Sequence, residues 1–322
     1  MFVPSIALEL REKINSVFYE GRVIPRHTET QHFYEDVTDN EIYASVTTKC
    51  ALLSRDYYKQ MAADKAVDHI VENIPRFSKM EPEEITEVFS YAREAHKHDL
   101  KRAGDFGTHG HDLVDRYVTE WIKTGSRPTD IKALVTPEIS NEGVCAGLSA
   151  VKFFDEFTLF PIVSERKVLS KKHKYAGTLD SLFLVGEVYK GRVGEPRCNH
   201  WWFEKSGGKI KCDACKREEQ LVLSLLDWKT SNQIFGVGSM SKFDYAMQVA
   251  AYSMAIKEMT KLTCKKHWIV RLDKKTPSYE IGVIADIKKA GKAFLAINEV
   301  SNYARSPQPP IEPLFKKQVI TL

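Results

Sequence analysis

The chain of 322 residues lacks the segments that direct a protein into a membrane or out of the cell. Glu9, Arg11 and Glu12 interrupt the first apolar residues, so no signal peptide is expected. No apolar run approaches the length of a membrane span. An internal repeat and a coiled-coil heptad pattern are also missing. We therefore expect an intracellular, cytoplasmic protein.

Cysteine is scarce, and half of it lies in one short region. Of the six cysteines, Cys198, Cys212 and Cys215 form a cluster, and the other three are scattered. In a reducing compartment such a cluster favours a metal site over disulfides. The scattered cysteines are expected to be small buried apolar residues.

Neither sign of charge is in large excess. The formal net charge is +4, with 43% hydrophobic and 28% charged residues, which is typical of a globular protein and excludes extensive disorder. This balance permits an acidic partner without requiring one. Local basic clusters are more informative, and Lys171, Lys172 and Lys174 are candidates for nucleic-acid contact. The alternative for such a cluster is solvated surface charge.

The hydrophobic pattern divides the chain at about residue 100. Residues 1–100 are predicted to be an N-terminal helical region, apart from a β-rich run at 43–48, with a helix over 52–72 and another beginning at Pro82. Residues 101–322 are predicted to form the main domain, with an inserted lobe at 190–218. Its expected strands are 162–169, 175–185, 221–226, 268–272 and 279–284, and its later helices are 242–261 and 287–303.

A predicted buried strand at 221–226 is followed directly by an acid and a lysine. The run 221–226 is largely apolar, and Asp227 and Lys229 follow it two residues apart. Side chains at i and i+2 of a strand lie on the same face. Such a pair is common by chance, so its neighbours decide its meaning.

Two further residues are candidate partners of this pair. Asp180 lies inside an apolar strand, where a metal ion or a structural salt bridge would neutralise it. His111 precedes the apolar face of a helix that ends at Gly125, and Thr108 is expected to cap that helix. His111 would then lie in the first turn, where the helix dipole favours a neutral, metal-binding imidazole. A capping or packing role is the alternative. His109 would face about 200° away.

The inserted lobe contains four potential soft or borderline metal ligands in two pairs. They are Cys198, His200, Cys212 and Cys215. This set fits a closed tetrahedral structural zinc site, with chance clustering or an iron–sulfur cluster as alternatives. Trp201 and Trp202 beside it either stack on nucleobases or form the core of the lobe.

Several features, in this order, resemble the RecB-like branch of the PD-(D/E)XK nuclease superfamily. They are Gly107-Thr108-x-x-His111, Gly177-Thr178-x-Asp180, Asp227-x-Lys229 and Gln248-x-x-x-Tyr252. The run 43–48 with its following helix looks like the first segment of phage-type and mitochondrial-type exonucleases of that branch. The resemblance spans about residues 43–303. The inserted cysteine lobe departs from it.

The resemblance implies an α/β fold with a restriction-endonuclease-like core, a central mixed β-sheet flanked by helices. It also implies catalytic residues at His111, Asp180, Asp227, Lys229, Gln248 and Tyr252. Asp180, Asp227, His111 and the Trp228 backbone carbonyl would hold Mg²⁺ or Mn²⁺. Lys229 would orient or deprotonate the attacking water, and Gln248 and Tyr252 would support the site or touch phosphate. Glu165, on the preceding strand, is expected to be structural.

The function that follows is metal-dependent hydrolysis of DNA, most simply by an exonuclease of recombination, repair or phage DNA metabolism. DNA is the expected partner, as single strands or duplex ends, together with a recombination or single-strand-binding protein. The N-terminal helices are expected to roof the site. A structure-specific endonuclease and a catalytically silent DNA-binding adaptor are the alternatives.

Overall fold

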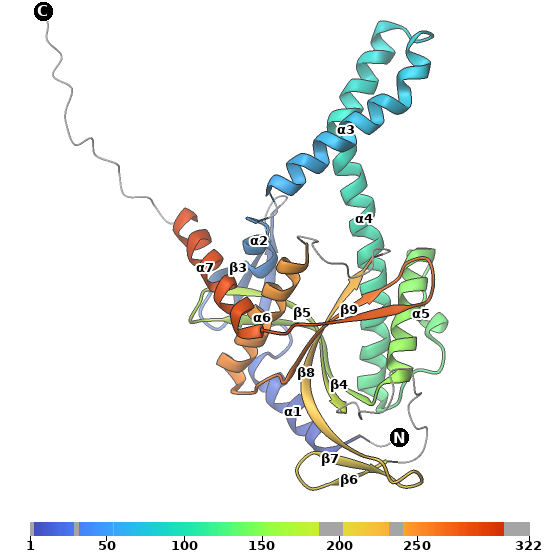
Figure 1. The fold of residues 1–322 in the computed structure, drawn as a ribbon. Helices are drawn as coiled ribbons and strands as arrows, with labels where there is room; N and C mark the ends of the chain where they lie inside the picture. Colours follow the sequence, from blue (N-terminus) through green and yellow to red (C-terminus); the bar gives the residue numbers. More distant parts are fainter. Residues whose placement is uncertain (1–2, 29–31, 54, 187–201, 232–240, 306–322) are drawn as a thin grey trace, which may run out of the picture.

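A mixed β-sheet forms the centre of the molecule in the computed structural model, which describes residues 3–28, 32–53, 55–186, 202–231 and 241–305 (Figure 1). The long hairpin of β4 and β5 pairs with β8, and β8 continues parallel to β9, which pairs antiparallel with β10. These strands are β4 (Leu159–Ser170), β5 (Tyr175–Gly186), β8 (Glu218–Thr230), β9 (Lys266–Leu272) and β10 (Tyr279–Val283). All five strands predicted for the main domain are present.

The first hundred residues contribute strands to the same sheet. An antiparallel meander of β1 (Val23–His27), β2 (His32–Asp36) and β3 (Glu41–Ser45) joins it because β3 pairs parallel with the start of β5. The expectation of a mainly helical region over residues 1–100 is therefore incomplete. The expected boundary at residue 100 also falls inside a helix, so the two parts share one fold.

Helices cover both faces of the sheet, and the apolar core consists of two clusters. One core cluster lies under the C-terminal half of α4 (Pro82–Thr124) and under α5 (Asn141–Glu156), with the short 3-10 helix η1 (Ile131–Leu134) at its edge. The other lies under α1 (Ser5–Val17), α2 (Val46–Cys50), α6 (Ser241–Thr260) and α7 (Ile287–Arg305). The molecule is thus an α/β protein with a mixed central sheet flanked by helices.

Helix α4 is 43 residues long and extends far beyond the sheet. Its N-terminal half packs against α3 (Arg55–Phe77), and the pair projects from the body as a helical arm (Figure 1). A capping box between Glu81 and Glu84 starts α4, and Gly125, with φ of 66°, ends it. The predicted helix start at Pro82 and the predicted helix end at Gly125 are both correct. The arm projects from the sheet, and the expected roofing of the site by the N-terminal helices stays a prediction.

The inserted lobe is described from residue 202 onward. Strands β6 (Trp202–Lys205) and β7 (Lys209–Cys212) form a hairpin that extends the N-terminal end of β8. Gly207 and Gly208 at its turn have φ of 75° and 73°, conformations that glycine adopts without strain. The hairpin also contacts α1, because Ser5 donates hydrogen bonds to Glu204. No helix among the described residues is long and apolar enough to cross a membrane.

Candidate metal and catalytic site

The site lies where strands β5 and β8 separate. Their backbone pairing ends at Ser181 and Leu226, and beyond this point Asp180 Oδ2 accepts a hydrogen bond of 2.7 Å from the Trp228 amide. The side chain of Asp180 therefore replaces a backbone acceptor. The fork between the strands leaves space for the side chains that follow.

Strand geometry places Asp227 and Lys229 together, as the sequence predicts. Lys229 Nζ lies 2.7 Å from Asp227 Oδ2. The intervening Trp228 points the other way, packs edge-on against Phe153 and Phe154, and donates from Nε1 to Ser181. The buried indole fixes the strand, so the pair on the opposite face is held rigidly.

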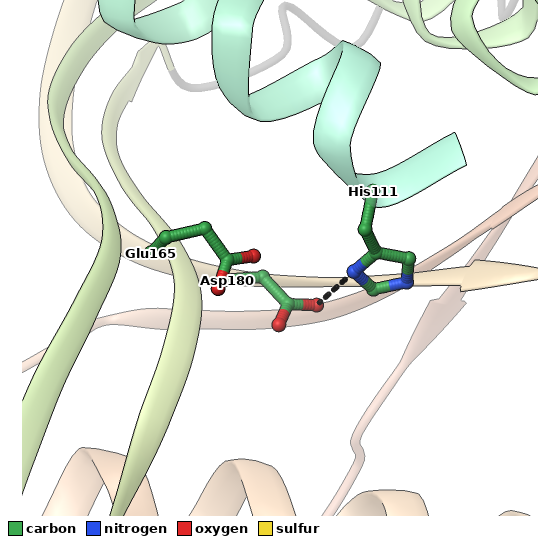
Figure 2. Close-up of side chains that lie close together, drawn as sticks. All are labelled: His111, Glu165 and Asp180. Carbon is green, nitrogen blue, oxygen red and sulfur yellow. Dashed lines mark ion pairs between the residues drawn. The ribbon is translucent and has the colours of Figure 1, made fainter. Parts of the chain in front are cut away.

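His111 reaches this fork from α4. Its Nδ1 lies 3.8 Å from Asp180 Oδ2 (Figure 2). The predicted helix start at Thr108 is wrong, because α4 begins at Pro82 and runs through these residues without a break. Burial, and next the charge of Lys229, lower the pKa of His111 to about 4. The imidazole is therefore neutral, as expected, although the helix dipole is not the reason.

Gly110, the residue before His111, allows α4 to approach β8 closely. A Cβ atom on Gly110 would lie 2.7 Å from Thr230 Cγ2 and 3.1 Å from the Ala146 side chain. These distances are shorter than normal van der Waals contact, so only glycine fits without movement. His109 faces away from the fork, where its Nδ1 accepts from the Ser140 amide at 3.3 Å. It serves packing between α4 and α5.

Glu165 belongs to the candidate site, although its expected role was structural. Ligand atoms of His111, Glu165 and Asp180 all lie within 4.8 Å of one another (Figure 2). Glu165 has φ of 43° inside β4, a conformation that a residue with a side chain rarely adopts in a strand. Because Ser164 pairs with Ser181 and Arg166 with Leu179, Glu165 lies opposite Asp180. Counting back from the hairpin turn would have found this neighbour.

The carboxyl groups of the site lie close together and lack sufficient positive charge, with Asp180 and Asp227 buried and Glu165 more exposed. Burial raises the pKa of Asp227 to about 6, although Lys229 opposes this. Burial and the charge of Asp180 raise the pKa of Glu165 to about 9. Burial also raises the pKa of Asp180, against Lys229 and the Trp228 amide. Three carboxyl groups thus face one ammonium group, an arrangement that favours a bound cation.

One buried carboxylate oxygen of Asp227 also favours a bound cation. Asp227 Oδ1 is fully buried and has no hydrogen-bond partner among the described residues. An unsatisfied buried carboxylate oxygen is costly unless a cation or proton neutralises it. The Trp228 backbone also lies within hydrogen-bonding reach of His111. Of the predicted ligands, His111 and Asp180 thus lie in one group with Glu165, and the Trp228 backbone lies beside His111. Asp227 is outside this group, and its carboxylate is paired with Lys229.

Helix α6 supplies the remaining predicted residues. Gln248 Oε1 lies 3.5 Å from Lys229 Nζ, and Gln248 Nε2 donates to the Tyr252 hydroxyl at 3.2 Å. Tyr252 lies directly against Gly177, where a Cβ atom would be 2.8 Å from the ring. Because Gly177 has no side chain, there is room for the Tyr252 ring at this position.

A cavity of about 400 Å³ opens beside these groups and is lined by His111, Glu165, Asp180, Gln248 and Tyr252, whereas Asp227 and Lys229 are not among its lining residues. Hydroxyl groups also line it, from Tyr34 and Ser45 of the meander, Thr47 of α2 and Thr178 of β5. Tyr34 and Thr178 hydroxyls lie 3.2 Å apart. The N-terminal strands thus form one wall of the site, a role that the sequence analysis did not predict for them.

The predicted nucleic-acid-binding residues lie in different environments. Lys171 forms ion pairs with Asp39 at 2.7 Å and Asp36 at 3.4 Å, and Lys174 pairs with Glu41. Lys172 is exposed. Because neighbouring acids offset two of these three charges, the cluster is less basic than its sequence indicates.

Only half of the predicted zinc site is described. Cys212 is buried and Cys215 is exposed, and the Cys215 amide donates to Cys212 Sγ at 3.4 Å. Cys198, His200 and Trp201 lie outside the described residues. Trp202 is 6% exposed and belongs to the apolar core, so it is not available for stacking on a base.

No protein-family model matches the chain, and a search of curated proteins found no significant similarity.

Proposed function

We propose that this protein is a divalent-metal-dependent deoxyribonuclease with a PD-(D/E)XK active site in a restriction-endonuclease-like core. The convergence of Asp180, Asp227, Lys229 and His111 at the fork between β5 and β8 carries the proposal. Two acids and a lysine at a strand fork suit phosphodiester hydrolysis, which needs an activated water and stabilisation of charge on phosphate.

Asp180, Asp227, His111 and the Trp228 carbonyl would hold the cation, and we add Glu165 to this set because of its distances to His111 and Asp180. Hard oxygen ligands suit Mg²⁺, and an imidazole ligand improves the match to Mn²⁺. A bound cation would supply positive charge at the scissile phosphate and increase the acidity of water.

Lys229 supplies the second positive charge. Burial alone would lower its pKa, but Asp227 and Asp180 outweigh burial, and the pKa lies above its ordinary value. The side chain is therefore an ammonium group at neutral pH. This form suits donation to a phosphate oxygen or orientation of the attacking water. Gln248 and Tyr252 hold it in place from α6.

We further propose that the enzyme acts on DNA ends. A cavity of about 400 Å³ has room for about one nucleotide. A strand entering this cavity does so most simply by its end. Incubation of linear and circular single-stranded DNA, and of linear and nicked duplexes, with the protein tests this. Release of mononucleotides or short products from linear DNA alone supports an exonuclease, whereas equal cutting of circles supports the endonuclease alternative.

The metal requirement has its own test. End-labelled DNA of both polarities is incubated with protein in Mg²⁺, Mn²⁺, Ca²⁺ or EDTA. Cleavage is expected in Mg²⁺ and Mn²⁺ only. DNA binding without cleavage under every condition would support the silent adaptor instead.

We also propose that the lobe at 190–218 binds structural zinc through Cys198, His200, Cys212 and Cys215. The hydrogen bond from the Cys215 amide to Cys212 Sγ supports the proposal, because it would stabilise a thiolate at the turn. Elemental analysis of the purified protein is expected to find about one zinc per chain. Substitution of Cys212 and Cys215 by serine should remove it, whereas substitution of Cys145 should not. Zinc retained by the double variant would refute the ligand set.

A further inference from the structure

Tyr245 contacts the lysine of the site from the first turns of α6. Lys229 Nζ lies 4.9 Å from the centroid of the Tyr245 ring. A cation within about 6 Å of an aromatic face is attracted by the ring quadrupole. Tyr245 is half-buried and Lys229 is mostly buried, and water weakens such an attraction less at buried positions.

Lys229 makes three contacts within the described part of the chain, and they differ in what they require from the ammonium group. An ammonium has three N–H donors. Asp227 lies within hydrogen-bonding distance at 2.7 Å, and Gln248 is a longer acceptor at 3.5 Å. An aromatic face attracts the charge without accepting a conventional hydrogen bond. It also adds no negative charge that would cancel the lysine.

We propose that Tyr245 is a positioning residue that holds the Lys229 ammonium through its ring face and leaves an N–H donor available for the substrate. This inference rests on the catalytic role proposed for Lys229. Lysine has a flexible four-carbon stem, so a contact from the side restricts the directions that Nζ samples. A third carboxylate would restrict it equally well but would weaken its interaction with phosphate.

The arrangement of α6 is consistent with this role. Tyr245, Gln248 and Tyr252 are spaced at i, i+3 and i+7, so they lie on one stripe of the helix. Tyr252 hydrogen-bonds Gln248, and Gln248 approaches Lys229. Tyr245 extends the same stripe to a second side of the ammonium group. One rigid helix therefore sets the position of Nζ at two points.

Spectroscopy without metal tests the contact itself. In ¹H–¹⁵N spectra of the lysine ammonium groups, the Lys229 signal, assigned with Lys229→Arg, should show an upfield ring-current shift. Tyr245→Leu should remove this shift, and Tyr245→Phe should retain it. Tyr19→Leu, at an exposed tyrosine of 46% accessibility, is the control and should change nothing. An unchanged Lys229 signal in Tyr245→Leu would overturn the inference.

Kinetics test whether the contact matters. Tyr245→Phe should cleave DNA at close to the wild-type rate, and Tyr245→Leu should lower kcat about tenfold with little change in KM. Phenylalanines with one, two and three ring fluorines at position 245 should lower kcat stepwise, because fluorine weakens the quadrupole while the shape is nearly preserved. Equal rates across the fluorinated series would contradict the role. If the wild-type protein does not cleave DNA, the nuclease proposal fails, and the metal-free spectra still decide the Tyr245–Lys229 contact.

Discussion

At the scale of single residues, Asp227 is a buried acid whose negative charge lowers the stability of the fold. It is 1% exposed, its carboxylate has one lysine partner, and one oxygen has no hydrogen bond among the described residues. Burial raises its pKa to about 6 from an ordinary 3.8. A carboxyl group with a raised pKa stabilises the fold when protonated, so its ionisation lowers stability as pH rises through 6.

Asp227→Asn should therefore stabilise the protein when no divalent cation is added. The asparagine resembles the protonated acid, so the gain in unfolding free energy should approach about 3 kcal/mol at pH 8. It should shrink as pH falls through 6 and vanish below about 4. Denaturant unfolding at several pH values measures this. Asp155→Asn, at an exposed ion pair with Arg127, is the control. A variant that is less stable than wild type at pH 8 would contradict the electrostatic description.

The residues of the site were predictable to different degrees. Strand alternation places Asp227 and Lys229 on one face, and the cost of an acid in an apolar strand singles out Asp180, but only the family resemblance joins them into one site. Glu165 lies in a polar part of its strand, so its local pattern does not indicate a site. Its contact with His111 depends on the β4–β5 register and on a positive φ, and neither is visible in local composition.

At the scale of elements, the contact between α4 and β8 sets the position of His111. Gly110 lies against Thr230 and Ala146 with no room for a Cβ atom. The histidine is one residue further along the same helix, so a displacement of α4 moves its imidazole relative to Asp180. The glycine is thus a packing residue that affects the geometry of the candidate metal site.

Gly110→Ala should weaken Mn²⁺ binding and destabilise the fold by about 1–3 kcal/mol, because it overpacks this contact. Thr230→Ser removes the methyl group that would lie 2.7 Å from the new Cβ. The double variant should therefore recover much of both losses. Titration calorimetry and thermal unfolding measure them. Losses in the double variant as large as in Gly110→Ala would show that this contact does not position His111.

The elements differed in predictability for physical reasons. Strands β4, β5 and β8 are buried apolar runs, and they appear where the pattern predicts them. The start of the His111 helix was misplaced because Gly107 and Gly110 are typical of a helix boundary in isolation. Packing against Thr230 overrides that preference, and α4 continues through both glycines.

At the scale of the whole molecule, segments far apart in the chain build one site. The N-terminal meander supplies Tyr34 and Ser45 to the cavity wall, α4 supplies His111, and β4 and β5 supply Glu165 and Asp180. The paired Asp227 and Lys229 come from β8. The pairing of β3 with β5 produces this arrangement. The family resemblance implied the α/β class and the mixed sheet, but it did not predict that residues 23–45 belong to the sheet. Short strands with exposed positions, such as Ile42 at 66%, give a weak pattern.

The most direct test of the nuclease assignment is the cleavage of end-labelled linear DNA in Mn²⁺ by Lys229→Met, with Mn²⁺ affinity measured on the same preparation. Lys229 is proposed to act on the substrate and not to bind the cation. Cleavage should therefore fall by at least about a hundredfold while Mn²⁺ binding is retained. Cleavage by Lys229→Met at the wild-type rate would contradict the proposed active site.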